Sequence, residues 1–190
     1  MNLTGKTALV TGSTSGIGLG IAQVLAQAGA TLILNGFGDV DAAKDAVAQY
    51  GKTPGYHGAD LSDEAQIADM MRYAESEFGG VDILINNAGI QRRHPFTEFP
   101  VQEWNDVISV NQTAVFLVSQ AVAKRMVDRQ QGKIINICSM QSELGRDTIT
   151  PYAAAKGAVK MLTRGMCVEL ARHNIQVNGI APGYFNTAMT

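Results

Sequence analysis

Tyr152 and Lys156 are the two residues whose types and spacing most directly suggest chemistry. They stand four positions apart, so a helix would place them on the same face. A free tyrosine is a poor base at neutral pH because its phenol titrates near pH 10, but an adjacent ammonium group favours the phenolate. Lowering that pKa to about 7 requires roughly 4 kcal/mol of stabilisation. Alone, the pair is more typical of an exposed helix surface, so it needs support from the rest of the chain.

Ser139 and Asn111 are polar residues at positions that could complete such a site. Ser139 directly follows the apolar run at 133–138, which predicts a buried strand, and its hydroxyl would hold the oxygen of a substrate. Asn111 lies among apolar positions of a helix predicted at 101–128. A polar side chain in such a stripe needs a partner, so Asn111 is either structural or catalytic. In the catalytic case it would keep a water that connects Lys156 to solvent.

A glycine-rich stretch at 11–18 follows the first apolar run and precedes a helical pattern at 19–28. A strand, such a turn and a helix together present unpaired backbone N–H groups to a phosphate, whereas an ordinary surface loop would bind nothing. Gly12 would allow the tight turn, Gly16 the close approach of a pyrophosphate, and Gly18 the packing of helix on strand. A dinucleotide with a cationic nicotinamide would supply the second charge that Tyr152 needs. The other positions assigned to this turn are Thr14, Ser15 and Ile17.

The end of the second predicted strand, at 30–34, is where the adenosine ribose would lie, and Asn35 and Phe37 are assigned to it. No lysine or arginine occurs at 13–15 or 35–39, and Asp39 would repel a 2′-phosphate. NAD is therefore the favoured cofactor, with NADP as the alternative. After the third strand, Asp60, with Leu61 beside it, is predicted either to accept a hydrogen bond from the adenine amino group or to cap the helix at 63–78.

Two further segments follow the fourth apolar strand. The first is a small-residue turn whose side-chain amides could tie neighbouring strand ends together, although an ordinary turn is the alternative. The second, at 91–100, lies where ligands bind in open α/β sheets, and its three basic side chains could face an anionic substrate or form a solvated loop. The turn residues assigned to the cofactor are Asn87, Ala88 and Gly89, and the basic residues are Arg92, Arg93 and His94.

The order of these elements predicts an α/β fold, namely a doubly wound, Rossmann-type parallel sheet of about six strands flanked by helices. Strands are expected at 7–10, 30–34, 55–59, 81–85, 133–138 and 175–180, and helices at 19–28, 41–50, 63–78 and 101–128. No linker, repeat or low-complexity stretch divides the chain. Residues 1–190 are thus expected to form a single dinucleotide-binding and catalytic domain.

Composition points to a globular protein that binds small molecules. Hydrophobic residues make up 46% and charged residues 17% of the 190 positions, and the net charge is −2, which offers no basic surface for nucleic acid and no polybasic membrane anchor. Cys138 and Cys167 have neither metal-ligand spacing nor the density of a disulfide framework. We expect no metal, no membrane segment and a reducing, cytoplasmic location.

Taken together, these motifs resemble those of the short-chain dehydrogenase/reductase family along the whole chain. The stretch 11–18 is similar to the family's cofactor turn, 86–89 to its Asn-Asn-Ala-Gly signature, and Asn111, Ser139, Tyr152 and Lys156 to its catalytic tetrad, of which Tyr152 and Lys156 also meet the cofactor. The resemblance implies hydride transfer between a nicotinamide cofactor and a secondary alcohol or ketone, in a homo-oligomer that in this family is a tetramer. It also implies nicotinamide contacts for Pro182, Gly183 and Thr187.

Within this family, residues 1–91 resemble bacterial 3-hydroxybutyrate dehydrogenases and residues 86–190 resemble gluconate 5-dehydrogenases, which suggests a chimera. Where the hydroxybutyrate enzymes carry a histidine and a lysine, this chain has Gln141 and Ile149, and an isoleucine cannot pair with a carboxylate. The resemblance favours a sugar acid, gluconate or its 5-keto product, over the hydroxy acid 3-hydroxybutyrate. The assigned substrate-binding residues are Gln91, Ser139, Gln141, Arg146, Tyr152 and Tyr184.

Members of the family continue past the position of Thr190 with a helical segment that covers the substrate and a further parallel strand. The resemblance therefore implies a chain truncated at its C-terminus, with the family's last strand missing. An exposed sheet edge and an uncovered pocket would follow. A cofactor-binding domain without catalytic activity is consequently the non-enzymatic alternative.

Overall fold

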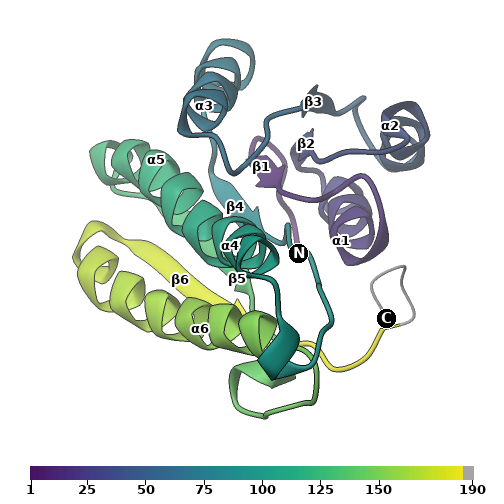
Figure 1. Cartoon of the computed structure of the whole chain (residues 1–190). Coiled ribbons are helices and arrows are strands. Elements are labelled where there is room, and N and C mark those ends of the chain that lie inside the picture. Colours follow the sequence, from purple (N-terminus) through teal and green to yellow (C-terminus); the bar gives the residue numbers. More distant parts are fainter. Residues whose placement is uncertain (186–190) are drawn as a thin grey trace.

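Six parallel strands form the sheet at the centre of the computed structural model, which describes residues 1–185 (Figure 1). Their order across the sheet is β3-β2-β1-β4-β5-β6, and each neighbouring pair is parallel. This confirms the predicted doubly wound α/β fold. The strands are β1 (Thr7–Val10), β2 (Thr31–Asn35), β3 (Gly55–His57), β4 (Ile83–Asn86), β5 (Gly132–Ile137) and β6 (Ile175–Ile180).

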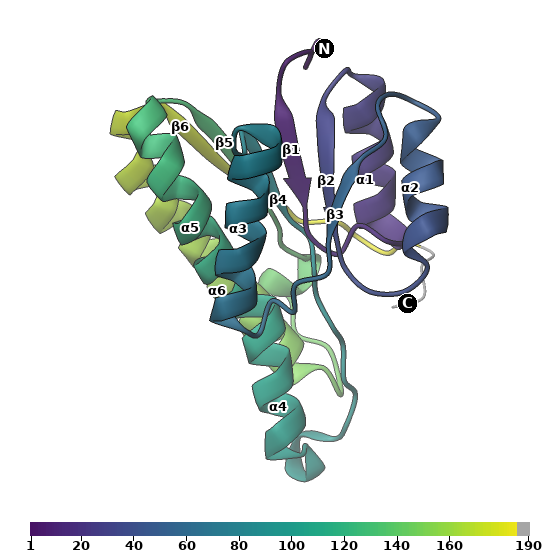
Figure 2. The ribbon, with the colours of Figure 1, turned by 90° about the horizontal axis from the view of Figure 1, so that it is seen from above.

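The helices cover both faces of this sheet. Figure 2 shows α1 (Gly16–Gln27) and α2 (Val40–Ala48) on one side, and α3 (Glu64–Phe78), α5 (Ala114–Arg129) and α6 (Thr150–Leu170) on the other. Because both faces are covered, the strand ends are left as the place where a ligand can reach the backbone. The remaining helical pieces are α4 (Val101–Ile108), a π-helical turn (Ser109–Thr113) and three short 3₁₀ helices, η1 (Phe96–Glu98), η3 (Met140–Ser142) and η4 (Ala171–His173).

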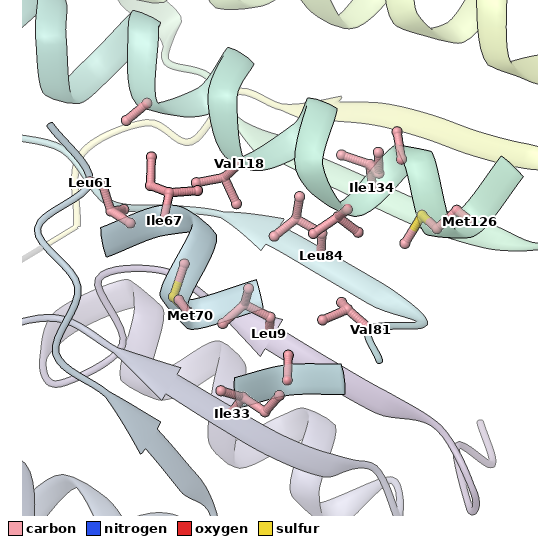
Figure 3. Packing of buried hydrophobic residues seen from close by; sticks show 14 of the residues in the cluster. Leu9, Ile33, Leu61, Ile67, Met70, Val81, Leu84, Val118, Met126 and Ile134 are labelled. Carbon is pink, nitrogen blue, oxygen red and sulfur yellow. The ribbon is translucent and has the colours of Figure 1, made fainter. Parts of the chain in front are cut away.

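Alternation along the strands builds one apolar layer on each face. On one side, Leu9, Ile33 and Leu84 of neighbouring strands pack against Met70 of α3 and Val118 of α5 (Figure 3). On the other side, the residues that flank these positions in β1 and β2 pack against small alanines of α1 and α2. Successive strand residues point to opposite faces, so the continuous apolar runs seen in the sequence are those of strands buried on both sides.

Two predicted elements differ in detail from the structure. The third strand ends at His57, where the side-chain amide of Asn35 donates hydrogen bonds to the carbonyl oxygens of His57 and Ala59, both at 3.0 Å. The helix expected at 101–128 is continuous in direction but opens into the π-helical turn around Asn111. Such single π turns accompany functional sites in many helices.

The helix cap after β3 also differs from one of the two predictions for Asp60. Asp63 is the N-cap residue of α3, because its carboxylate accepts hydrogen bonds from the backbone N–H groups of Ala65 and Gln66. The carboxylate of Asp60 instead accepts bonds from the backbone and hydroxyl of Ser62. The capping alternative for Asp60 was therefore wrong, since Asp60 organises the loop before the helix.

β6 lies at one end of the strand order and pairs with β5 alone among the strands of residues 1–185. Its alternate residues Ile175 and Val177 are buried, while Ile180 is half exposed. None of the helices in this described part of the chain combines the length and apolar character needed to cross a membrane.

Candidate active site

The carboxyl ends of the strands bring the predicted site residues to one edge of the sheet. In a parallel sheet all these ends meet at one edge, and the strand order reverses between β1 and β4, where ligands bind in folds of this kind. A cavity of about 740 Å³ opens there. Of the predicted residues, those that line it are Gly12, Thr14, Ser15, Gly16, Ile17, Asn35, Phe37, Asp60, Leu61, Asn87, Ala88, Gly89, Gln91, Ser139, Tyr152, Lys156, Pro182 and Gly183.

Ser139, Tyr152 and Lys156 converge at one wall of this cavity. Ser139 follows β5, and its hydroxyl lies near enough to that of Tyr152 on α6 to lower the pKa of the phenol by hydrogen bonding. The ammonium nitrogen of Lys156 lies 5.8 Å from the centre of the Tyr152 ring and donates a 2.6 Å hydrogen bond to the carbonyl oxygen of Ile137. The helix thus presents both side chains to the end of β5, as the four-residue spacing predicts.

Burial acts on both ionisable side chains of this group in the same sense, toward their neutral forms. Burial raises the pKa of Tyr152 above its usual value of 10, and the hydrogen bond from Ser139 offsets part of that rise. Lys156 is only 4% exposed, and burial lowers the pKa of its ammonium group to about 8. Burial is the largest influence on the phenol pKa in this structure, and the lowering expected from Lys156 together with a cationic nicotinamide stays a prediction.

Asn111 is fully buried in the π-helical turn between α4 and α5. Its side-chain oxygen accepts a 2.7 Å hydrogen bond from the backbone N–H of Ile90, and its nitrogen donates a 2.9 Å bond to the carbonyl oxygen of the same residue. Both polar atoms of the amide are therefore engaged in holding the segment after β4 against this helix. Asn111 itself does not line the cavity, although its neighbour Val110 does.

The glycine-rich turn is held by close packing that a larger residue would break. An added Cβ at Gly18 would lie 2.2 Å from the carbonyl oxygen of Gly12, and one at Gly12 would lie 2.8 Å from the Cα of Ala88. Asn87 fastens the same turn by donating 3.0 Å hydrogen bonds to the carbonyl oxygens of Thr11 and Gly12. Gly18 is buried beneath the turn and does not line the cavity, which fits its predicted packing role.

The adenosine end of the cavity is organised around the end of β2. Asn35 is 1% exposed, and its amide nitrogen is committed to the backbone after β3 as described above. Thr14 donates from its hydroxyl to the carbonyl oxygen of Phe37, whose side chain is 68% exposed. Asp39 caps α2 by accepting a 3.0 Å hydrogen bond from the N–H of Ala42. The turn, β2 and the start of α2 are therefore joined into one rim.

The predicted substrate residues divide between the cavity and its surroundings. Gln91 lines the cavity, while Gln141, Arg146 and Tyr184 do not. Arg146 donates a 3.0 Å hydrogen bond to the hydroxyl of Tyr184, and its guanidinium lies over that ring, so the two form a pair between separate loops. Thr187 lies outside the described residues.

Only some of the basic residues in the loop after β4 line the cavity. Arg92 and Arg93 line the cavity, whereas His94 turns away and lies 3.0 Å from the carboxylate of Glu103. Cavity-lining residues that the sequence did not assign are Ile90, Val110, Ile137, Cys138 and Phe185, along with Gly36 and Ala59. All except Ile137 are next to an assigned residue, so adjacency in sequence to an assigned residue was the signal that could have found them.

A family model for short chain dehydrogenases matches residues 6–190. The chain belongs to the short chain dehydrogenase family. This agrees with a site that joins a glycine-rich turn to a tyrosine and a lysine, and it makes the protein an oxidoreductase of that family.

Members of the family with known names support this. The chain is 61% identical to a 5-keto-D-gluconate 5-reductase of Escherichia coli K12 over 194 aligned residues, which cover all of this chain and 75% of that protein. It is 47% identical to a D-beta-hydroxybutyrate dehydrogenase of Cupriavidus necator, covering 98% of this chain and 73% of that one. The crystal structure of a gluconate 5-dehydrogenase from Burkholderia cenocepacia J2315, in complex with NADP and tartrate, matches with a TM-score of 0.93 and 47% identity, covering 99% of this chain and 74% of the other.

Proposed function

We propose that this chain transfers a hydride between NAD(P) and a sugar acid, interconverting gluconate and its 5-keto product. The observation that carries the proposal is that one cavity joins the glycine-rich turn to Ser139, Tyr152 and Lys156. A phosphate-binding turn and a proton-transferring group in a shared space are what hydride transfer at a CH–OH carbon requires. The names of the relatives, a 5-keto-D-gluconate 5-reductase and a gluconate 5-dehydrogenase, support the substrate.

The residues of the turn fit a dinucleotide. No side chain of residues 1–185 caps the first turn of α1, and that turn carries no acidic residue, so its backbone N–H groups are open to a pyrophosphate. When bound, the nicotinamide supplies the carbon that accepts or donates the hydride. The cavity-lining cofactor residues named above would hold it, with Gly18 supporting the turn from below and Thr187 proposed from the family resemblance.

We favour NAD over NADP at the adenosine end. The only ionised side chain on the rim at 35–39 is Asp39, whose carboxylate covers the N-terminus of α2, the place where a phosphate would otherwise find free N–H groups. NADP remains the alternative, since the relative from Burkholderia cenocepacia holds that cofactor. Binding titrations of both cofactors, read by fluorescence of the reduced forms, decide between them.

Tyr152 is the proposed general acid and base. In the direction of oxidation it would take the proton of the substrate hydroxyl, and in reduction it would donate a proton to the ketone oxygen. Because burial keeps its pKa high, the phenol is protonated at neutral pH in this structure, which suits reduction. Ser139 would hold the substrate oxygen, since its hydroxyl already hydrogen-bonds that of Tyr152. Lys156 would favour the phenolate and meet the cofactor, and Asn111 would fix the segment beside them.

One uncharged side chain supports a polyhydroxylated substrate. The amide oxygen of Gln91, which lines the cavity, is buried without a hydrogen-bond partner among residues 1–185, whereas the similarly unpartnered oxygen of Gln141 lies outside the cavity lining. A site with such an acceptor favours a ligand that donates a hydroxyl group to it, since an unfilled buried acceptor is costly. Arg92 and Arg93 would offer a counter-charge to the carboxylate, and Arg146 with Tyr184 would border the substrate.

The test is turnover by purified protein with NADH and 5-keto-gluconate, followed by loss of NADH absorbance. Tyr152→Phe keeps the ring and removes only the reacting hydroxyl, so it should lower kcat by about 10²- to 10⁴-fold while NADH binding persists. Full activity of the phenylalanine variant would overturn the role of Tyr152. Absence of turnover in either direction with sugar acids would overturn the substrate.

Two alternatives have specific support. The similarity to a D-beta-hydroxybutyrate dehydrogenase favours 3-hydroxybutyrate, but Ile149 is 2% exposed and apolar, so it offers nothing to that substrate's carboxylate. Comparison of kcat/KM for gluconate and 3-hydroxybutyrate decides this point. The second alternative is a domain that binds cofactor without turnover, for which the phosphate-binding turn before α1 would suffice. Cofactor binding without turnover of either acid would support it.

The remaining sequence-based expectations stay proposals. Residues 1–91 and 86–190 are proposed to come from two kinds of enzyme, and a natural gene encoding both in one reading frame would dispose of this chimera. The chain spans about 75% of the length of the first named relative, and a single dinucleotide-binding and catalytic domain over residues 1–190 is proposed. The cytoplasmic location is likewise a proposal.

A homotetramer is also proposed, because the family that this chain resembles forms tetramers. Large apolar side chains on α5 and α6 are exposed, namely Phe116 (45%), Met161 (59%) and Val168 (80%). Such side chains at solvent supply the apolar area that a subunit interface would bury. Sedimentation analysis of the chain and of Val168→Glu tests this, because a monomeric wild-type protein would contradict the proposal.

A further inference from the structure

Ser142 joins the backbones of two residues of the proposed catalytic set. Its hydroxyl oxygen accepts a 3.2 Å hydrogen bond from the backbone N–H of Ser139. The same hydroxyl donates a 3.0 Å bond to the carbonyl oxygen of Lys156. The first bond closes the η3 turn after β5, and the second ties this turn to the second turn of α6. One side chain therefore spans the two elements that must meet for Ser139 to reach Tyr152.

The turn itself is built reciprocally. Ser139 adopts an extended backbone and its hydroxyl accepts a 3.1 Å bond from the N–H of Gln141, while Ser142 returns a bond to Ser139. This resembles a capping box, because the hydroxyl of Ser139 accepts from a backbone N–H inside the turn and the hydroxyl of Ser142 accepts from the backbone N–H of Ser139. The Ser139 hydroxyl that would hold the substrate oxygen is thus oriented partly by Ser142.

Both the side chain and the backbone of Lys156 are hydrogen-bonded to the stretch of chain around Ser139. Its ammonium nitrogen donates to the carbonyl oxygen of Ile137, just before Ser139, and its own carbonyl oxygen accepts from Ser142, just after. Removal of the Ser142 hydroxyl would leave the Lys156 side chain and the ion pair between Glu143 and Lys160 as the polar ties between this stretch and α6. The hydrogen bond between the hydroxyls of Ser139 and Tyr152 depends on how this stretch meets α6.

We infer that Ser142 is a positioning residue, which sets the distance between the hydroxyls of Ser139 and Tyr152 by tying the η3 turn to α6. This rests on the proposed function of those two residues. Ser142 is absent from the lining of the active-site cavity and instead borders a neighbouring cavity with Glu143 and Lys160. Its effect on catalysis is therefore exerted through Ser139 and Lys156, without contact to substrate.

The experiment compares Ser142→Ala, Ser142→Thr and a matched control, Ser76→Ala. The hydroxyl of Ser76 donates to the carbonyl oxygen of Tyr73 on the exposed end of α3, so its loss removes a similar bond far from the site. The measurements are kcat, KM and the pH profile of kcat with 5-keto-gluconate, the Kd for NADH, and the melting temperature of each variant.

Ser142→Ala should lower kcat by about 10- to 100-fold, because a misplacement near 1 Å costs about that much in a reaction that needs aligned groups. NADH affinity should stay within about twofold, since the glycine-rich turn is untouched. The basic limb of the pH profile should move to higher pH, because a weaker bond from Ser139 leaves the phenol of Tyr152 with a higher pKa. Ser142→Thr retains the hydroxyl and should recover most of kcat, and Ser76→Ala should match the wild type.

Three results would overturn the inference: unchanged kcat and pH profile in Ser142→Ala, a threonine variant as slow as the alanine variant, or losses that simply follow NADH binding or unfolding. A wild-type protein inactive on every sugar acid would instead count against the proposed function. In that case the role of Ser142 is still tested by an ultraviolet titration. The titration of the Tyr152 phenol is obtained by subtracting the spectrum of the Tyr152→Phe protein at each pH. The titration must move to higher pH in Ser142→Ala, and an unmoved titration refutes the inference.

Discussion

Replacing Lys156 with methionine should remove one defined pH dependence of the protein's stability. Burial lowers the pKa of the ammonium group from 10.5 to about 8 in the folded chain. Between these two values the unfolded chain binds a proton that the folded chain does not, so the free energy of unfolding rises with pH there. Below pH 8 both states carry the proton, and the folded state bears the full cost of a buried charge.

The magnitude follows from the pKa difference. The drop from 10.5 to about 8 corresponds to about 3 kcal/mol of destabilisation at neutral pH, of which about 2 kcal/mol is recovered between pH 7 and pH 10. In Lys156→Met this component vanishes. The carbonyl oxygen of Ile137 loses its donor, which costs about 1–3 kcal/mol but does so equally at every pH.

Urea denaturation of both proteins at intervals from pH 7 to pH 10 measures the effect. The difference between their free energies of unfolding cancels the titration of groups that do not interact with Lys156, Cys138 being the exception, so the wild type should gain about 2 kcal/mol on the variant across this range. Measurements stop at pH 10 because the phenol of Tyr152 begins to matter above it. Two parallel stability curves would refute the reasoning, since they would mean that Lys156 is not destabilised by burial.

Three further changes test other parts of the site. Gly18→Ala should abolish NADH binding and lower the free energy of unfolding by at least about 1–3 kcal/mol, because the added Cβ would lie 2.2 Å from the carbonyl oxygen of Gly12. NADH fluorescence measures the binding, and thermal melting measures the stability. Asn111→Ala should lower the free energy of unfolding by about 2–4 kcal/mol, because both backbone groups of Ile90 would lose their partners, and urea denaturation measures this loss. Asp39→Asn should tighten NADP binding severalfold with NAD binding unchanged, because the amide oxygen still caps α2 while the charge is lost; cofactor titration checks this.

Each of these three has an outcome that would contradict it. Asp41→Asn on the same helix turn is the control for Asp39, and an equal response of both variants would show that net charge alone is responsible. An Asn111→Ala protein with wild-type stability would mean that water replaces the amide at Ile90. Normal NADH binding by Gly18→Ala would mean that the turn can shift away from α1 without loss of its shape.

The strand order and the cavity edge could be predicted because they depend on features that the sequence displays directly. Apolar runs separated by helical patterns define a parallel sheet, and side chains that follow such runs must meet at one edge. Glycines at 12 and 18 were assigned correctly to a tight turn and to packing, because a glycine between a strand and the helix that follows it typically serves one of these two purposes. The contacts of their absent Cβ atoms bear this out.

The partners of polar side chains could not be predicted in the same way. Asp60 and Asp63 both precede a helix, and only the backbone direction shows that Asp63 is the cap. The direction of the Tyr152 pKa in this structure could not be predicted, because spacing reveals a neighbouring ammonium but not the extent of burial, and burial is the largest effect on both groups. Ser142 carried no recognisable signal, since a serine beyond a short turn is common and its partner on α6 is distant in sequence.

A chain of buried amides and hydroxyls links these observations to the placement of α6. Asn86 at the end of β4 donates to Ser119 of α5 and to Asn136 of β5, both at 2.8 Å, and Asn136 in turn donates to Thr163 of α6 at 2.9 Å. Apolar contacts alone permit helices to slide over a sheet, whereas fully paired buried polar groups have one geometry in which all are satisfied. The register of α6 on the sheet is therefore specified twice, by this buried chain near its middle and by Ser142 near Lys156. A tyrosine that must meet a serine on another element gains from both, because an error in either the rotation or the translation of α6 would separate the two hydroxyls.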